Sequence, residues 1–354
     1  MLNRQSPRKP VSPGLTRRAL VRGLGAGALV LLGGGVAWLG GRKRTRLFAG
    51  QRAMMGTRAT ILLAHEDSTL AEALVAAALD RMEAIAAVLT RFDPGSEIGR
   101  ANALAGERIA IGHDAATVIQ TALSIARASD GAFDPGLDRL STLWGFHDRA
   151  APAALPTAAA LAPWRGRHAH RAVELTWLGG QAWLRIRDAA VGLDLGGIAK
   201  GYAIDQGVAL LRAAGARHAL VEAGGDLYAL GSHPGGGAWP VGVRHPRDPK
   251  RMLAVLSVRD EGVATSGDYE RYFERDGQRY GHLIDPGSAR PAPGLRSLTV
   301  RAPSAMLADA WATAGFVARP EAARALLRRV STAPWLAVDS AGRVEGGSPR
   351  AGSV

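Results

Sequence analysis

The sequence contains no cysteine among its 354 residues. Disulfides, thiolate metal sites, a cysteine nucleophile and lipid attachment to a cysteine are therefore excluded. Aromatic residues make up only 5% of the chain, which leaves few rings on which nucleic-acid bases could stack. Lysine is also scarce, because four lysines stand against forty arginines. A lysine inside a motif therefore suggests that a compact point charge is needed there, because arginine would supply a planar guanidinium instead.

Acidic residues are absent from the first 46 positions, which hold ten of the 44 basic residues. The rest of the chain carries 34 basic and 31 acidic residues, and this near balance argues against a nucleic-acid partner. Arg17 and Arg18 precede an apolar run over residues 23–41, a pattern that resembles a twin-arginine export signal. The run approaches the ~20 residues that span a bilayer. We expect residues 1–46 to be an export signal or an inner-membrane anchor, and the protein to act in the periplasm.

Periodic patterns in the remaining chain predict both helices and strands, and 47% hydrophobic residues suffice for a large core. Helices are expected over residues 69–89, 115–129, 198–215 and 306–317. Strand-like runs cover residues 57–63, 173–176, 182–186, 219–222, 227–231, 239–243, 253–258 and 298–300. Residues 148–168 are rich in alanine and proline, and we expect them to form a surface insertion or a weak boundary.

The stretch LDLGGIAKGYAID at residues 193–205 combines a carboxylate, a glycine pair and a lysine. Glycines let a ligand approach the backbone, and the helix expected after them would direct unpaired N–H groups at an anion. With Asp194 before the glycines and Lys200 after them, the pattern is typical of a phosphate site. The alternative is a strand, a turn and a surface helix with a solvated lysine, and these residues alone leave both readings open. The spacing matches neither the phosphate loop nor the dinucleotide fingerprint.

Two pairs of polar residues are further candidates in the second half of the chain. His282 and Asp285 flank one strand end, and either could accept a proton; His282 is slightly preferred because its ordinary pKa lies near neutral pH. A lone histidine is also often simply packed or solvated. Asp309 and Thr313 lie four residues apart, hence on one helix face. Their oxygens suit Mg²⁺, although the two side chains could also merely bond each other.

Nine motifs between residues 54 and 316 resemble the FAD:protein FMN transferase (ApbE) family, in the order in which that family carries them. They read MGT, SEI followed by Asn102, AFDP, LWGF, LDLGGIAKGYAID, EAGGD, ATSGDY, HLIDP and DAWAT. The resemblance implies an α+β fold of mixed, largely antiparallel sheets flanked by helices. We expect this fold to form a single catalytic domain over residues 47–345, followed by a disordered tail over 346–354.

The resemblance also implies a Mg²⁺-dependent reaction. The FMN half of FAD would pass through a phosphodiester bond to a threonine of a client redox protein, and AMP would be released. By motif, FAD would be bound by Met55, Phe92, Ala132, Phe133, Asp134, Asp194, Lys200 and Leu283. The metal would be bound at Gly197, Asp309, Ala312 and Thr313, and His282 and Asp285 would lie beside the reacting phosphate.

The sequence departs from the family pattern at three motif positions. Ser288 and Ala289 replace the usual threonine and glycine after HLIDP, so the turn there is expected to differ. Trp311 replaces the leucine of the helix motif, and Phe92 offers a ring without a hydroxyl.

Two other functions remain open from the residues alone. One is a periplasmic FAD pyrophosphatase, in which water replaces the threonine and every catalytic group is shared. The other is a non-catalytic flavin-binding assembly factor for a redox complex such as nitrous oxide reductase. Moving a phosphoryl group needs no enzyme nucleophile, only placement and charge neutralisation. Lys200 together with Asp309 and Thr313 therefore favours catalysis over simple binding.

Overall fold

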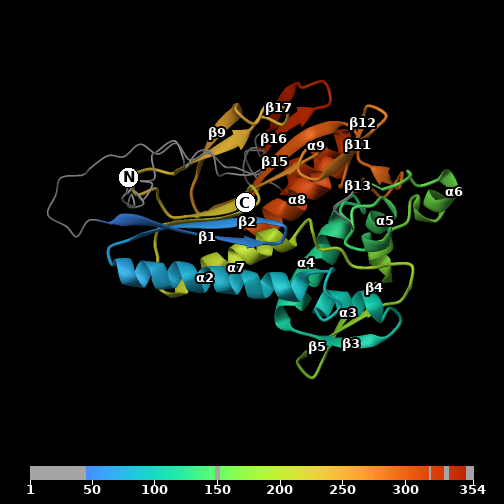
Figure 1. The fold of residues 1–354 in the computed structure, drawn as a ribbon, viewed down its shortest axis with the longest axis horizontal. Helices are drawn as coiled ribbons and strands as arrows, with labels where there is room; N and C mark the ends of the chain where they lie inside the picture. Colours follow the sequence, from blue (N-terminus) through green and yellow to red (C-terminus); the bar gives the residue numbers. More distant parts are fainter. Residues whose placement is uncertain (1–44, 148–151, 319, 331–334, 348–354) are drawn as a thin grey trace, which may run out of the picture.

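The structure is a computed structural model, and it describes residues 45–147, 152–318, 320–330 and 335–347. An eight-stranded sheet runs in the order β1-β2-β6-β7-β10-β15-β16-β17 (Figure 1). Its strands are β1 (Arg46–Met54), β2 (Thr57–His65), β6 (Ala219–Ala223), β7 (Asp226–Leu230), β10 (Glu261–Gly267), β15 (Leu295–Ala302), β16 (Trp335–Asp339) and β17 (Val344–Gly347). Every neighbouring pair in this sheet is antiparallel.

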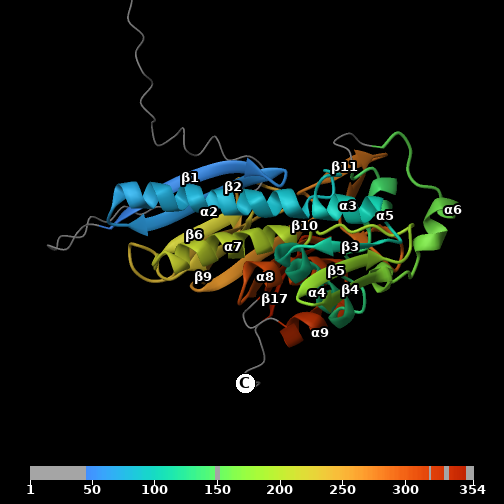
Figure 2. The same ribbon diagram turned by 90° about the horizontal axis from the view of Figure 1, so that it is seen from below.

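Three helices cover one face of this sheet: α2 (Ser68–Leu89), α7 (Ala199–Ala213) and α8 (Ala305–Val317). Figure 2 shows α2 running beside α7 along the sheet. Alternate residues of a strand point to opposite faces, and Ala219, Val221 and Ala223 of β6 belong to the main core that these helices complete. The helix α9 (Pro320–Val330) packs against α8.

The opposite face of the sheet is covered by a hairpin of β8 (Trp239–Arg244) and β9 (Met252–Val258). Leu220, Leu227 and Val263 from the sheet pack with Trp239 and Val258 of the hairpin in a separate apolar cluster. Both faces of the central strands are therefore shielded from solvent, which explains why all five residues of β7 are buried.

A smaller three-stranded sheet, in the order β3-β5-β4, adjoins the helical layer together with two helices (Figure 1). Its elements are β3 (Arg108–Ile111), β4 (Val173–Leu178), β5 (Gln181–Ile186), α3 (Glu97–Ala103), α4 (His113–Ala128) and the short 3₁₀ helix η2 (Ala169–Ala172).

A third apolar cluster is built from short elements near the end of the sheet. They are α5 (Asp138–Leu143), α6 (Ala158–Leu161), η1 (Ala162–Trp164), β11 (Tyr272–Arg275), β12 (Gln278–Gly281), β13 (Ile284–Asp285) and β14 (Arg290–Pro291). The segment predicted as a surface insertion supplies Leu161 and Trp164, both buried in this cluster beside Trp144 and Phe273. That prediction was therefore incomplete, because two large side chains of the segment have apolar partners.

The predicted α+β class, with largely antiparallel sheets flanked by helices, is confirmed. The domain limits differ slightly, since β1 already includes Arg46 and β17 extends to Gly347. The proposed signal lies outside the described residues except for its last two positions, and so does most of the proposed tail. No helix in the described part of the chain is long and apolar enough to cross a bilayer.

Candidate active site

Lys200, in the first turn of α7, lies between two buried carboxylates. Its Nζ is 2.6 Å from Asp226 Oδ2, at the start of β7, and 3.2 Å from Asp309 Oδ2, on α8. Burial opposes the charge of Lys200, but the two carboxylates outweigh it and raise the pKa of Lys200 above its ordinary value. The ammonium therefore stays protonated, and with 26% of the side chain exposed it can still meet a ligand.

Asp309 and Thr313 lie on the face of α8 that is turned toward the glycine pair. The Gly201 N–H, in the first turn of α7, donates to Asp309 Oδ2 at 3.2 Å, so one helix N–H predicted to face an anion is satisfied by the protein itself. A Cβ placed on Gly197 would lie 2.9 Å from Thr313 Oγ1, which means that the glycine admits this hydroxyl. Ser266 Oγ of β10 lies 3.3 Å from the same hydroxyl. Burial raises the pKa of Asp309, and the Lys200 ammonium opposes that rise.

These donors fit a hard divalent cation. A carboxylate, a hydroxyl and a closely approaching backbone are the oxygen ligands that Mg²⁺ accepts, and Mg²⁺ usually keeps several waters or substrate oxygens as well. Among the described residues, no cluster of three or more His, Cys, Asp or Glu side chains forms a metal cage. A cation at Asp309 would therefore be held partly by its substrate.

The position of α8 is fixed from α7. Both oxygens of the Asp205 carboxylate accept N–H bonds from the first turn of α8, from Ala305 at 2.8 Å and from Met306 at 2.9 Å. Gly201 lets the helices approach, since a Cβ there would lie 2.3 Å from the Ala305 carbonyl oxygen. The last residue of LDLGGIAKGYAID thus sets where Asp309 lies.

Asp194 stabilises the glycine turn itself. Its Oδ1 accepts the Gly196 N–H at 2.9 Å, and its Oδ2 lies 3.3 Å from Nε of the buried Arg91. The Arg91 guanidinium also pairs with Asp138 of α5. Asp194 is therefore a charged edge of the site, held in place by a buried arginine.

The tautomer of His282 follows from its hydrogen bond. Its Nδ1 lies 3.1 Å from the Arg271 carbonyl oxygen, which can only accept, so Nδ1 carries the proton and Nε2 has the free lone pair. Burial, together with the positive charges of Arg271 and Lys200, lowers the pKa of His282 to about 4. Asp285 instead accepts N–H bonds from Gly287 at 2.9 Å and Ser288 at 3.2 Å, closing the following turn. His282 has a free lone pair on Nε2, whereas both Asp285 oxygens already accept hydrogen bonds, and this favours His282 as the base.

Comparison with known proteins accounts for this arrangement, because the model of the ApbE family matches residues 55–335. The chain belongs to the ApbE family. The FAD:protein FMN transferase of Treponema pallidum is 37% identical over 322 residues, covering 85% of this chain and 87% of that protein. A solved ApbE protein from Thermotoga maritima has a TM-score of 0.78 at 30% identity, covering 86% of this chain and 97% of its own. The Pseudomonas stutzeri flavinyl transferase ApbE, in its apo form, has a TM-score of 0.74 at 30% identity, covering 86% and 95%.

The remaining ApbE motif residues lie around this centre with different exposures. Phe92 is 54% exposed and lies beside the His147 ring, with ring centroids 5.0 Å apart. Phe133 is buried, and one of its ring carbons would lie 3.2 Å from a Cβ at Gly197. Met55 forms the tip between β1 and β2 at φ 51°. Ala312 is fully buried, which leaves only its backbone for a ligand.

The Asp134 carboxylate, like the Phe133 ring, is buried. Its oxygens accept N–H bonds from Gly136 at 2.8 Å and from His170, whose backbone N is 3.1 Å and ring Nδ1 3.0 Å away. The Asp134 carboxylate is therefore occupied by N–H groups of the protein, and the binding of FAD by Asp134 and Ala132 stays a prediction. Leu283 packs against the main core.

The turn after HLIDP holds Ala289, which replaces the usual glycine, in a strained backbone conformation. Ala289 adopts φ 58°, a left-handed conformation that favours glycine, and its N–H donates to the Asp285 carbonyl oxygen at 2.8 Å. The Ala289 carbonyl oxygen accepts from the Trp144 indole at 2.9 Å. These contacts hold the alanine in a conformation that favours glycine, and the expected difference of this turn from the family pattern stays a prediction.

Sequence reasoning assigned no role to Asp226, Arg91 or Asp205. The EAGGD motif carried a signal for Asp226, since it places a glycine pair beside a carboxylate as the central stretch does. No spacing rule connects residues so far apart, however.

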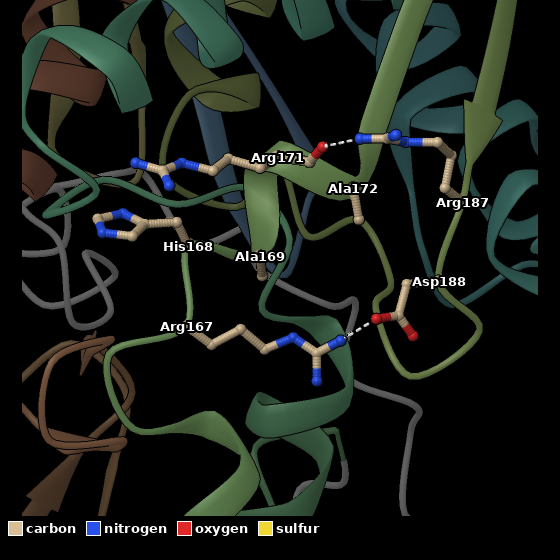
Figure 3. Close-up of a pocket in the computed structure, with 7 residues that line it drawn as sticks. All are labelled: Arg167, His168, Ala169, Arg171, Ala172, Arg187 and Asp188. Atoms are coloured by element: carbon tan, nitrogen blue, oxygen red, sulfur yellow. Dashed lines mark hydrogen bonds and ion pairs between the residues drawn. The ribbon is translucent and has the colours of Figure 1, made fainter.

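An open cavity of about 320 Å³ lies apart from these residues (Figure 3). It is lined by Arg167, His168, Ala169, Arg171, Ala172, Arg187 and Asp188. Arg167 pairs with Asp188, and Arg187 donates to the Arg171 carbonyl oxygen at 2.9 Å (Figure 3). None of the predicted flavin or metal residues lines this cavity.

Proposed function

We propose that this chain is a Mg²⁺-dependent FAD:protein FMN transferase that moves the FMN half of FAD to a threonine of a client redox protein and releases AMP. Its ApbE relatives carry that transferase name. The observation that carries the proposal is the group formed by Lys200, Asp309 and Thr313 at the Gly196–Gly197 turn. It joins a fixed ammonium to hard oxygen donors where α7 begins.

The chain's own residues supply placement and proton transfer. The Lys200 ammonium stabilises negative charge on the pyrophosphate, and the glycine turn allows phosphate oxygens to approach the backbone. His282 Nε2 accepts the threonine hydroxyl proton as its oxygen forms a bond to the FMN phosphorus. The bond from that phosphorus to the AMP oxygen breaks, and AMP leaves with the electron pair. A Mg²⁺ ion bound at Asp309 and Thr313 would neutralise charge on the phosphate oxygens.

The metal assignment is tested by titrating Mg²⁺ against transfer rate for wild type, Asp309→Ala and Thr313→Val. We expect Asp309→Ala to need a much higher Mg²⁺ concentration, because it removes the charged donor. Thr313→Val keeps the shape and should show a smaller effect. Curves for wild type and Asp309→Ala that coincide would place the metal elsewhere.

The acceptor is tested by mass spectrometry of a threonine-containing client after incubation with the chain, FAD and Mg²⁺. A transferase gives one flavinylated client for each AMP released. A pyrophosphatase releases AMP and free FMN and leaves the client unmodified. An assembly factor binds FAD and releases no AMP.

We further propose that residues 1–46 direct export to the periplasm, supported by the paired Arg17 and Arg18 before an apolar run. Replacing both arginines with lysine should leave the protein in the cytoplasm, as measured by fractionation. Unchanged periplasmic recovery would refute the export role.

A further inference from the structure

Asp226 makes the shorter of the two ion pairs of Lys200, but no motif predicted a role for it. Its Oδ2 lies 2.6 Å from Lys200 Nζ, whereas the Asp309 oxygens lie 3.2 and 3.3 Å from that nitrogen. Within the described residues, Asp226 Oδ2 is buried and has no hydrogen-bond partner apart from this ion pair. A buried carboxylate oxygen satisfied by one ammonium holds that ammonium strongly, because the alternative is an uncompensated charge.

The other oxygen of Asp226 is fixed by the sheet. The Thr265 N–H of β10 donates to Asp226 Oδ1 at 3.2 Å, and β10 pairs with β7. The carboxylate therefore belongs to the rigid sheet, whereas Lys200 ends a flexible side chain on α7. Of the two partners, Asp226 determines where the ammonium lies.

The charges of this triad are unequal, since two carboxylates face one ammonium. If Lys200 paired with Asp309 alone, it would neutralise the carboxylate that the proposed function assigns to the cation. We propose that Asp226 is a positioning residue: it holds the Lys200 ammonium on the sheet side, so that Asp309 remains able to bind a divalent cation next to a charged lysine. This inference rests on the proposed function in taking Asp309 as the cation ligand.

The chain offers a matched control carboxylate in Glu270. Glu270 interacts electrostatically with Asp226 and Lys200, but its carboxylate accepts a hydrogen bond from the Arg244 guanidinium at 2.7 Å. Glu270→Gln removes a nearby negative charge without releasing Lys200. If Mg²⁺ binding depends only on the local negative charge, both variants should weaken it. If it depends on where Lys200 is held, only Asp226→Asn should weaken it.

The test is a calorimetric titration of the full chain with Mg²⁺ in the absence of FAD, after thermal unfolding has confirmed that each variant is folded. We expect Asp226→Asn, which keeps the acceptor for Thr265, to weaken Mg²⁺ binding by about tenfold or more, because Lys200, which already donates to both Asp309 oxygens, then has Asp309 as its only carboxylate partner among these groups and neutralises it more fully. The double variant Asp226→Asn with Lys200→Met should return to within about threefold of wild type. Glu270→Gln should also stay within about threefold.

Two outcomes would overturn the role of Asp226. If the double variant binds as weakly as Asp226→Asn, Asp226 is itself a metal ligand. If Glu270→Gln weakens binding as much as Asp226→Asn, the effect is a general electric field. Should Asp226→Asn not fold, Lys200→Met decides alone: Mg²⁺ binding at least as tight as in wild type supports the inference, and weaker binding refutes it.

The calorimetry needs no client protein, so the positioning role of Asp226 and the transferase function can be refuted separately. A chain that shows these binding ratios but transfers no FMN would refute the proposed function and keep the positioning role. Transfer activity without the expected ratios of Mg²⁺ affinity would support the proposed function and refute the positioning role of Asp226.

Discussion

The titration of His282 gives the sharpest test of the proposed base. Burial and the charges of Arg271 and Lys200 lower the pKa of His282 to about 4, while the bond to the Arg271 carbonyl oxygen keeps Nε2 free to accept a proton. The free enzyme should therefore hold this base in its active, neutral form well below pH 6. An ordinary histidine, with a pKa of about 6.5, would be mostly protonated and inactive as a base at these pH values.

The expected magnitude follows from the two protonation curves. Between pH 7 and pH 5 the neutral fraction of an ordinary histidine falls about 25-fold, whereas that of a histidine with a pKa of about 4 falls by only about 10%. The value of kcat/KM for FAD reports the free enzyme, so at saturating Mg²⁺, which keeps Asp309 ionised, it should be nearly flat over this range. His282→Ala should lower transfer by about 10²–10⁴-fold and leave FAD affinity nearly intact.

The assay is FMN transfer to a threonine-containing client at limiting FAD, from pH 4.5 to 8, with Asp285→Asn as the matched variant. Asp285 closes a turn through the Gly287 and Ser288 N–H groups, so its amide variant should keep the flat profile. A decline in kcat/KM centred near pH 6.5 would refute the structural reasoning. Normal turnover by His282→Ala, with an inactive Asp285→Asn, would assign the proton to the other residue.

Two further predictions concern the half-buried carboxylates of Asp205 and Glu222. Asp205→Ala should lower the free energy of unfolding by about 2–3 kcal/mol in urea titrations, because two N–H groups of α8 lose their acceptor. The control Asp67→Ala removes the exposed N-cap of α2 and should lower it by about 1 kcal/mol. Equal losses in the two variants would contradict the role of Asp205 in fixing α8. Burial raises the pKa of Glu222 to about 7, so the folded state keeps a proton that the unfolded chain loses near pH 4.5, and wild-type stability should fall as pH rises from 4.5 to 7. Glu222→Gln should remove the contribution of Glu222 to that decline and exceed wild type by up to about 3 kcal/mol above pH 7. Parallel stability curves for the two proteins would refute the shift.

Local patterns predicted much of the architecture around the site. The four-residue spacing of Asp309 and Thr313 placed both on one helix face, and the glycine pair marked where α7 begins. Gly215 follows the end of α7 at φ +86°, the conformation that its role as a helix stop requires. Each of these features depends on neighbours in sequence, which is why a periodic pattern can reveal it.

The ion pairs of the site could not be predicted in this way. Lys200 meets Asp226 because β6 and β7 return the chain to the start of α7, and it meets Asp309 because α8 packs on α7. The inward orientation of the Asp134 carboxylate could not be predicted for a related reason. Its partner His170 lies beyond an intervening segment, so the sequence could not show that the carboxylate faces inward.

The balance of charge around Lys200 supports a requirement for a cation. The Lys200 ammonium faces two carboxylates, those of Asp226 and Asp309. His282, with a pKa of about 4, adds no positive charge near neutral pH. A pyrophosphate entering this group brings further negative charge, which a surplus of carboxylates would repel. A divalent cation at Asp309 reverses that surplus, so substrate and metal should each increase the affinity of the site for the other.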